Sequence, residues 1–93
     1  MNHFIRTNKL ENQREDIMKR VVINMKILNH YNIILDILQY RINQFPGSNS
    51  HSSNIINSFE YFDNLRSELL HYTSRLYRRA YQIKNMIEMS YLN

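Results

Sequence analysis

The chain has 93 residues, of which 43% are hydrophobic, and its 12 Lys and Arg against 8 Asp and Glu give a formal net charge of +4. One glycine and one proline are too few turn formers for a sheet or an α/β unit, so a single all-α domain over residues 1–93 is predicted. The absence of cysteine excludes a disulfide framework, a thiolate zinc site and a cysteine nucleophile.

The first predicted element is a helix over residues 8–44. Residues recur there at alternating steps of three and four, which is the spacing of a coiled-coil seam. The predicted seam positions are Leu10, Arg14, Ile17, Val21, Asn24, Leu28, Tyr31, Leu35, Leu38, Ile42 and Phe45. Asn8 with Glu11 resembles an N-cap with a capping box, and Pro46 with Gly47 is expected to end the helix.

A cluster of turn formers, PGSNSHSSN, marks a loop over residues 45–53. The second helix is predicted over residues 54–91, with Ser53 or Asn54 as its N-cap and a further capping box at Asn57 and Glu60. Its predicted seam is Phe62, Leu65, Leu69, Tyr72, Leu76, Ala80, Ile83 and Ile87, with one irregular step after Leu76. We therefore expect a long antiparallel, coiled-coil-like helical hairpin.

A second apolar stripe lies beside the seam of the first helix. It consists of Ile23, Ile27, Ile34 and Ile37 and is displaced by roughly 100°. One partner helix covers both stripes only if it tilts across them, and this alternative stays open, as does a different fold for part of the chain. We expect instead that a second copy, or a helical segment of another protein, completes a four-helix or larger bundle. The predicted anchors of this contact, from the stripe and the seam, are Ile23, Ile27, Leu28, Tyr31, Ile34, Leu35 and Ile37.

Two polar residues, Arg14 and Asn24, occupy seam positions where leucine is usual. A polar seam residue lowers stability but fixes register and partner number, because a shifted pairing leaves it without a hydrogen bond. The other interpretation is that both lie at the edge of the seam and reach water, which suits the long stem of Arg14.

The stretch RLYRRAYQIK, residues 75–84, interleaves four cations with two tyrosines. In a hairpin its arginines come level with cations of the first helix. The candidate contacts with an anion or a nucleic acid are Lys19, Arg20, Lys26, Arg75, Arg78, Arg79 and Lys84. Residues 1–30 and 71–93 hold ten Lys and Arg against four Asp and Glu, so an acidic partner, an anionic membrane surface or plain solvent are also consistent with this end.

No pattern for catalysis or metal binding is present. His3, His30, His51 and His71 are not spaced as metal ligands, and one glycine excludes a glycine-rich phosphate loop. We therefore predict no enzyme, no cofactor and no metal.

The predicted function is a non-catalytic protein–protein interaction module, such as an assembly subunit, adaptor or small chaperone. The alternative is a small nucleic-acid-binding regulator that uses the face from Arg75 to Lys84 of a dimer. The start of the chain lacks the apolar core of a signal peptide, and no uninterrupted apolar run reaches the roughly 18 residues of a membrane span. A cytoplasmic location without a transmembrane segment is expected.

Overall fold

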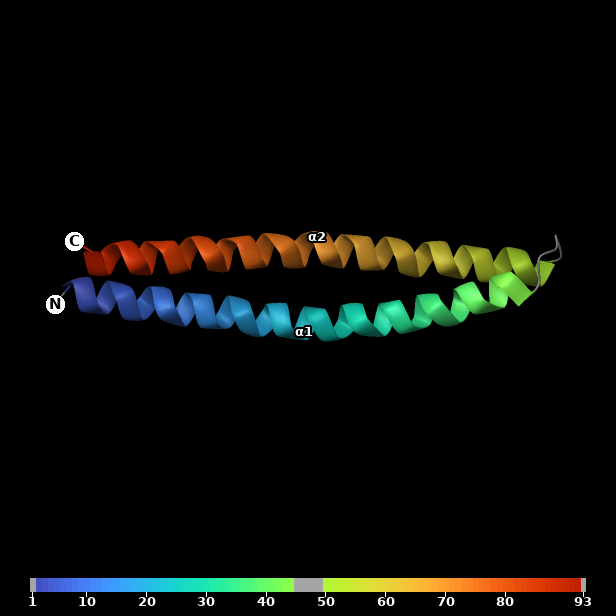
Figure 1. The fold of residues 1–93 in the computed structure, drawn as a ribbon, viewed down its shortest axis with the longest axis horizontal. Coiled ribbons are helices and arrows are strands. Elements are labelled where there is room, and N and C mark those ends of the chain that lie inside the picture. The colour runs from blue at the N-terminus through green and yellow to red at the C-terminus, as the bar shows by residue number, and fades with distance from the viewer. Residues whose placement is uncertain (1, 45–49, 93) are drawn as a thin grey trace. The chain divides into compact units, whose positions relative to one another are not determined.

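Two long helices make up the described part of the chain. The computed structural model describes the backbone of residues 2–44 and 50–92, and the side chains of residues 5–44 and 53–92. Helix α1 is Asn2–Gln44 and helix α2 is Ser50–Leu92, and Figure 1 shows each as continuous. The predictions of an all-α chain and of a helical hairpin are confirmed, and the predicted end of the first helix at residue 44 is also correct.

Both helices begin earlier than predicted, so the predicted N-caps are wrong. α1 begins at Asn2 rather than at Asn8, and α2 begins at Ser50 rather than at residue 53 or 54. The reason for α1 is that the seam extends towards the N-terminus, where Thr7 is buried, and packing outweighs the weak local preference of a capping motif. The second capping box, at Asn57 and Glu60, likewise lies inside α2. Phe45, Pro46 and Gly47 lie outside the described residues.

The chain divides into two compact units, and each contains a segment of both helices. Unit 1 comprises residues 1–25 and 72–93, and unit 2 comprises residues 26–71. The prediction of one domain over the whole chain stays a prediction. The two units are described separately below.

The interior of unit 1 forms where the first turns of α1 meet the last turns of α2. Leu10, Ile83 and Ile87 form one cluster, with Ile17 packed against it. Ile83 is the most buried of these side chains, with 1% of its surface exposed. Because early residues of one helix contact late residues of the other, the two segments of unit 1 are antiparallel.

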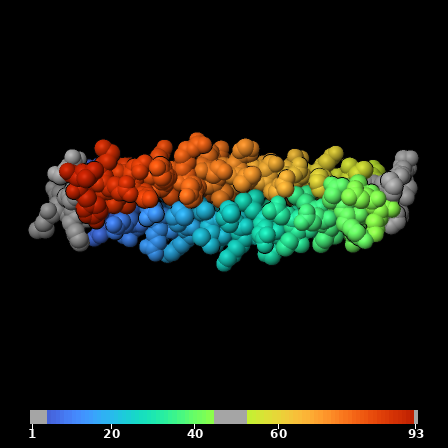
Figure 2. All heavy atoms as spheres, viewed as in Figure 1, coloured from blue at the N-terminus to red at the C-terminus, as the bar shows by residue number. Residues whose placement is uncertain are grey.

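The interior of unit 2 contains Leu28 and Leu35, both buried. Next to them the rings of Tyr31 and Phe62 lie 6.1 Å apart between centroids. Arg66 connects the helices, since its guanidinium donates to the side-chain oxygen of Asn32 at 3.3 Å and pairs with Asp63 at 2.7 Å. Figure 2 shows the side chains of the two helical segments of unit 2 meeting along their length.

The seam of α1 is confirmed from Leu10 to Ile42, because every predicted position except Arg14 is buried or half-buried. The seam of α2 differs from the prediction at two positions: Arg66, half-buried, takes the place of Leu65, and Thr73, 4% exposed, takes the place of Tyr72, 42% exposed. The buried and half-buried residues at steps of three and four are Ile55, Phe59, Phe62, Arg66, Leu69, Thr73, Leu76, Ala80, Ile83, Ile87 and Ser90. The predicted irregular step after Leu76 is therefore wrong, and the heptad phase of α2 is uniform.

Candidate interaction surfaces

The uniform seams define which residues share a side of each unit. Read in opposite directions, they bring Leu10 level with Ile87 in unit 1 and Leu35 level with Phe62 in unit 2. The seam residues alternate between heptad positions d, such as Leu10 and Ile83, and a, such as Val21 and Ile87. In an antiparallel pair, the residues that directly follow d on both helices flank one side of the seam, and the residues that directly precede a flank the other. The groove of unit 1 described next confirms this arrangement, because its residues come from the first of these sides on both helices.

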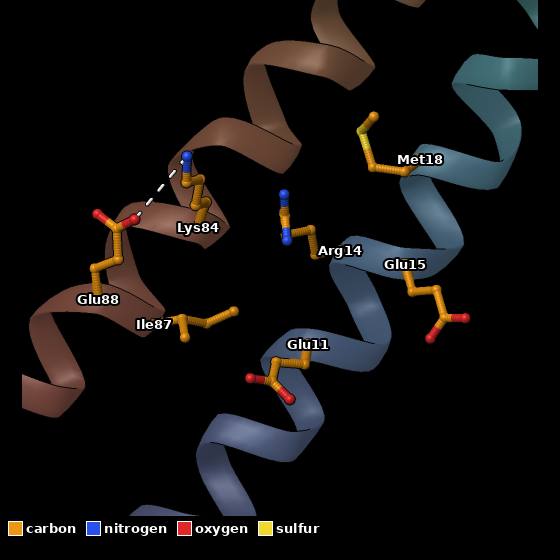
Figure 3. Close-up of a pocket in the computed structure, with 7 residues that line it drawn as sticks. All are labelled: Glu11, Arg14, Glu15, Met18, Lys84, Ile87 and Glu88. Carbon is orange, nitrogen blue, oxygen red and sulfur yellow. Dashed lines mark ion pairs between the residues drawn. The ribbon is translucent and has the colours of Figure 1, made fainter.

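A groove of about 610 Å³ runs along unit 1. It is lined by Glu11, Arg14, Glu15, Met18, Lys84, Ile87 and Glu88, and Figure 3 shows Arg14 extending into the space between the helices. Lys84 pairs with Glu88 at 4.0 Å. Arg14 is exposed. The interpretation in which this seam residue reaches water is therefore correct. We call this side of unit 1 the groove side.

The opposite side of unit 1 carries arginines, and we call it the arginine side. It is formed by Arg20 of α1 with Arg75 and Arg79 of α2, and Arg78 lies on the adjoining outer surface. All four are exposed, and no ion pair joins any of them to another of the residues that the structure describes. Lys19, by contrast, pairs with Glu15 at 3.6 Å.

The arginines and tyrosines of residues 75–84 lie on different sides. Positions two apart on a helix are separated by about 200°, so Tyr77 and Tyr81 point away from Arg75 and Arg79. Both tyrosines instead line a smaller groove of about 140 Å³ that shares Lys84 with the larger one. Lys84 therefore belongs to the groove side and not with the arginines, and Lys26 belongs to unit 2.

In unit 2 the side that corresponds to the arginine side carries isoleucines, with polar residues such as Arg41 and Ser58 beside them. Ile27 is 37% exposed and Ile37 is 51% exposed, while Ile34 between them is half-buried. We call these three residues the isoleucine face. The same side of α2 adds Leu65, half-buried, and Tyr61, 60% exposed. The alternative that helix two tilts across both apolar stripes is therefore wrong.

The other residues predicted as anchors have different places. Leu28 and Leu35 are buried in the interior of unit 2, and half-buried Tyr31 packs against Phe62, so these three are core residues rather than surface anchors. Ile23 belongs to unit 1 and is 56% exposed. The prediction combined two sets because the seam and the second stripe are interleaved in the sequence.

Unit 2 also buries little of its α2 segment. Between residues 53 and 71 no side chain is buried. The seam residues Ile55, Phe59, Phe62 and Leu69 are half-buried. Ile56 and Leu70 are exposed by 42% and 51%. This segment therefore has apolar surface that the contact with α1 does not cover.

Sequence reasoning missed one polar layer, in unit 1. The seams bring Asn24, half-buried, level with Thr73, whose hydroxyl oxygen Oγ1 is buried without a hydrogen-bond partner among the described residues. Thr73 went unnoticed because the apolar neighbour Tyr72 was assigned to the seam. The uniform heptad spacing backwards from Ala80 was the signal that identifies it.

Two further properties concern chemistry and membranes. Among the described residues, no three His, Cys, Asp or Glu side chains lie close enough together to hold a metal ion, and His30 and His71 are both exposed. Part of α1 within Ile5–Gln44 is long and apolar enough to cross a membrane by length and composition alone, a property that core helices of soluble proteins share. The predicted absence of a transmembrane segment and the cytoplasmic location stay predictions.

Comparisons with models of protein families, with curated proteins and with solved structures found no match to this chain. The functional conclusions below therefore rest on its own residues.

Proposed function

We propose that this protein is a non-catalytic assembly subunit, in which unit 2 packs against unit 2 of a second copy to complete a helical bundle. The observation that supports it is the isoleucine face, in which Ile27 and Ile37 are exposed and Ile34 is half-buried. Full burial of an isoleucine is worth about 1.5–3 kcal/mol, so covering half-exposed ones stabilises an assembly by about 1 kcal/mol each. Half-buried Phe59 and Phe62 add to the surface that a bundle covers.

The spacing of the isoleucine face suits a helix of the same kind. Ile27 and Ile34 are one heptad apart, and Ile37 follows three residues later, so a helix with a heptad stripe can pack its side chains between them. α1 itself carries such a stripe. A second copy therefore offers a matching surface without any further sequence.

Charge also favours self-association through unit 2. Unit 2 holds three Lys and Arg against four Asp and Glu, a net charge of −1, so two copies meet with little repulsion. Its α1 segment is net positive, with Lys26 and Arg41 against Asp36. Its α2 segment, with Arg66 against Glu60, Asp63 and Glu68, is net negative. Segments of opposite sign attract when α1 of one copy lies near α2 of the other.

The test compares two double variants of the full chain by light scattering over a concentration series, with circular dichroism on the same samples. The parent is expected to be a strongly helical dimer or tetramer. Ile27→Asp with Ile34→Asp is expected to give a monomer of lower helicity, because four or more carboxylates cannot be buried without partners. The matched control is Asn29→Asp with Asn43→Asp, which adds the same charge to the same helix at exposed positions on its other flank.

Each result decides the proposal. An unchanged mass in the isoleucine variant, or an equal loss of mass in the control, would show that this face does not hold the assembly. A parent that is monomeric at every concentration would exclude a second copy and assign the face to a helix of a different protein.

A further inference from the structure

Unit 1 separates its charges between its two sides. It holds nine Lys and Arg against four Asp and Glu, a net charge of +5. Three of its four carboxylates, those of Glu11, Glu15 and Glu88, line the groove side. The fourth carboxylate belongs to Asp16. Among the described residues of unit 1, it is the one acidic group whose heptad position lies on the arginine side.

The cations are concentrated on the arginine side and the adjoining outer surface. Five exposed cations lie at the same level of unit 1: Lys19, Arg20, Arg75, Arg78 and Arg79. Arg6 and Lys9 extend the same side towards the start of α1. Like charges repel, so gathering cations on one side does not stabilise the fold, whereas it creates a positive surface that attracts an anionic ligand.

We propose that the arginine side of unit 1 binds the phosphate backbone of double-stranded nucleic acid without reading its sequence. Guanidinium groups match phosphate oxygens with paired hydrogen bonds, and the four arginines have no competing carboxylate partner among the described residues. The inference concerns a different unit from the assembly proposed above and does not depend on it.

A duplex fits this side better than a single strand or a membrane. Single-strand binding stacks successive bases on aromatic rings beside the cations, but among the described residues Tyr72 is the one aromatic residue of unit 1 on this side, whereas Tyr77 and Tyr81 lie on the groove side. A membrane-binding helix needs a continuous apolar stripe beside its cations, whereas the exposed apolar residues of this side, Ile23, Tyr72 and Met86, are separated by Gln82 and the arginines. Phosphate contacts alone need neither feature.

The salt dependence of binding is the first measurement. Fluorescence anisotropy of a labelled duplex of about 20 base pairs is titrated with the parent chain at several salt concentrations. Neutralising about four phosphates gives a slope of log K against log[salt] of about −3.6, so affinity falls on the order of 100-fold between 50 and 200 mM salt. A parent that does not bind the duplex at 50 mM salt would overturn the proposal.

Two matched variants locate the contact. Arg75→Gln with Arg79→Gln is expected to weaken binding about 10- to 100-fold at 50 mM salt and to reduce the slope by about 2. Arg14→Gln with Lys84→Gln removes the same charge at exposed positions on the groove side of unit 1, and is expected to retain the parent slope. Equal losses in the two variants would mean that net charge alone drives binding and would overturn the site.

Two controls complete the test. Arg20→Gln, on the other helix, is expected to reduce the slope by about 1, and this variant decides the case if circular dichroism shows that the double variant has lost helicity. Polyglutamate and vesicles of phosphatidylserine are then offered as competitors at an equal concentration of anionic groups. If polyglutamate displaced the labelled duplex as effectively as unlabelled duplex does, the arginine side would be assigned to an acidic protein. Equally effective displacement by the vesicles would assign it to a membrane surface.

Discussion

Unit 1 and unit 2 share two helices and one heptad pattern, yet polar residues occupy five of the twelve seam positions in unit 1 and one of the ten in unit 2. Those of unit 1 are Thr7, Arg14, Asn24, Thr73 and Ser90, and that of unit 2 is Arg66. The net charges differ too, since unit 1 carries +5 from nine cations and four anions and unit 2 carries −1, whereas both units expose apolar side chains, among them Ile23 of unit 1 and Ile37 of unit 2.

The difference lies in the seams and in the net charge. Unit 1 combines a partly polar seam with a strongly positive surface, although Val22, Ile23 and Met25 are each at least 50% exposed as well. Unit 2 has the more apolar seam but leaves apolar side chains uncovered on both helices. Polar seam residues favour one register and apolar ones add stability, so the seams of the two units contribute differently to the pairing of the helices, and the association of unit 2 with a second copy stays a proposal.

The largest effect is expected from the interior of unit 2. Leu35→Ala removes a side chain that is 4% exposed and is expected to lower the free energy of unfolding by about 2–5 kcal/mol, through lost burial and the cavity left behind. Urea denaturation followed by circular dichroism, at fixed protein concentration, measures it. Asn29→Ala, at an exposed position of the same helix, serves as control with a change within about 0.5 kcal/mol.

A small effect of Leu35→Ala would break the comparison. If Leu35→Ala lowered the free energy of unfolding by less than about 1 kcal/mol, a seam residue of unit 2 would stabilise the fold no more than an exposed residue does. The contrast between the two units would then reduce to charge alone.

The predictable part of this fold is its periodicity. The seam of α1 follows from steps of three and four, and the exposed isoleucines follow because a stripe about 100° from the seam lies beyond the reach of one partner helix. The predicted anchors that lie in the core were misplaced for one reason. Leu28 and Leu35 were assigned to a partner, although a hairpin must bury its own seam first.

The parts that sequence reasoning missed depend on phase and on helix ends. Tyr72 and Thr73 are neighbours, and choosing the more hydrophobic one shifts the phase of α2, although the small β-branched Thr73 is the one that faces α1. The helix starts at Asn2 and Ser50 were missed because capping motifs are weak local signals. The separation of arginines from tyrosines in residues 75–84 was predictable from helix geometry, since residues two apart face opposite ways.

An intermediate effect, of opposite sign, is expected from the polar layer of unit 1. Thr73→Val replaces a buried hydroxyl that has no hydrogen-bond partner by a methyl group of similar size, which should raise the free energy of unfolding by about 1 kcal/mol. For a chain of this size that corresponds to a rise in Tm of about 4–8 °C, measured by thermal denaturation. Asn24→Leu, at the facing position, is expected to raise Tm as well, but to broaden the distribution of oligomers seen by light scattering. A fall in Tm for Thr73→Val would mean that the hydroxyl has a partner, and Asn24 would be the first candidate.

The smallest effect is expected from the surface ion pairs of unit 1. Lys19 and Glu15 are 3.6 Å apart, with 67% and 65% of their side chains exposed, and a pair of this kind contributes about 0.3–0.5 kcal/mol. Lys19→Gln should therefore change the free energy of unfolding by less than about 0.5 kcal/mol, and the difference should vanish in 1 M salt, where charges are screened beyond about 3 Å. A loss above about 1 kcal/mol that persists in salt would mean that charged residues of unit 1 help to hold its helices together, so that its charge could no longer be regarded as surface available to a ligand.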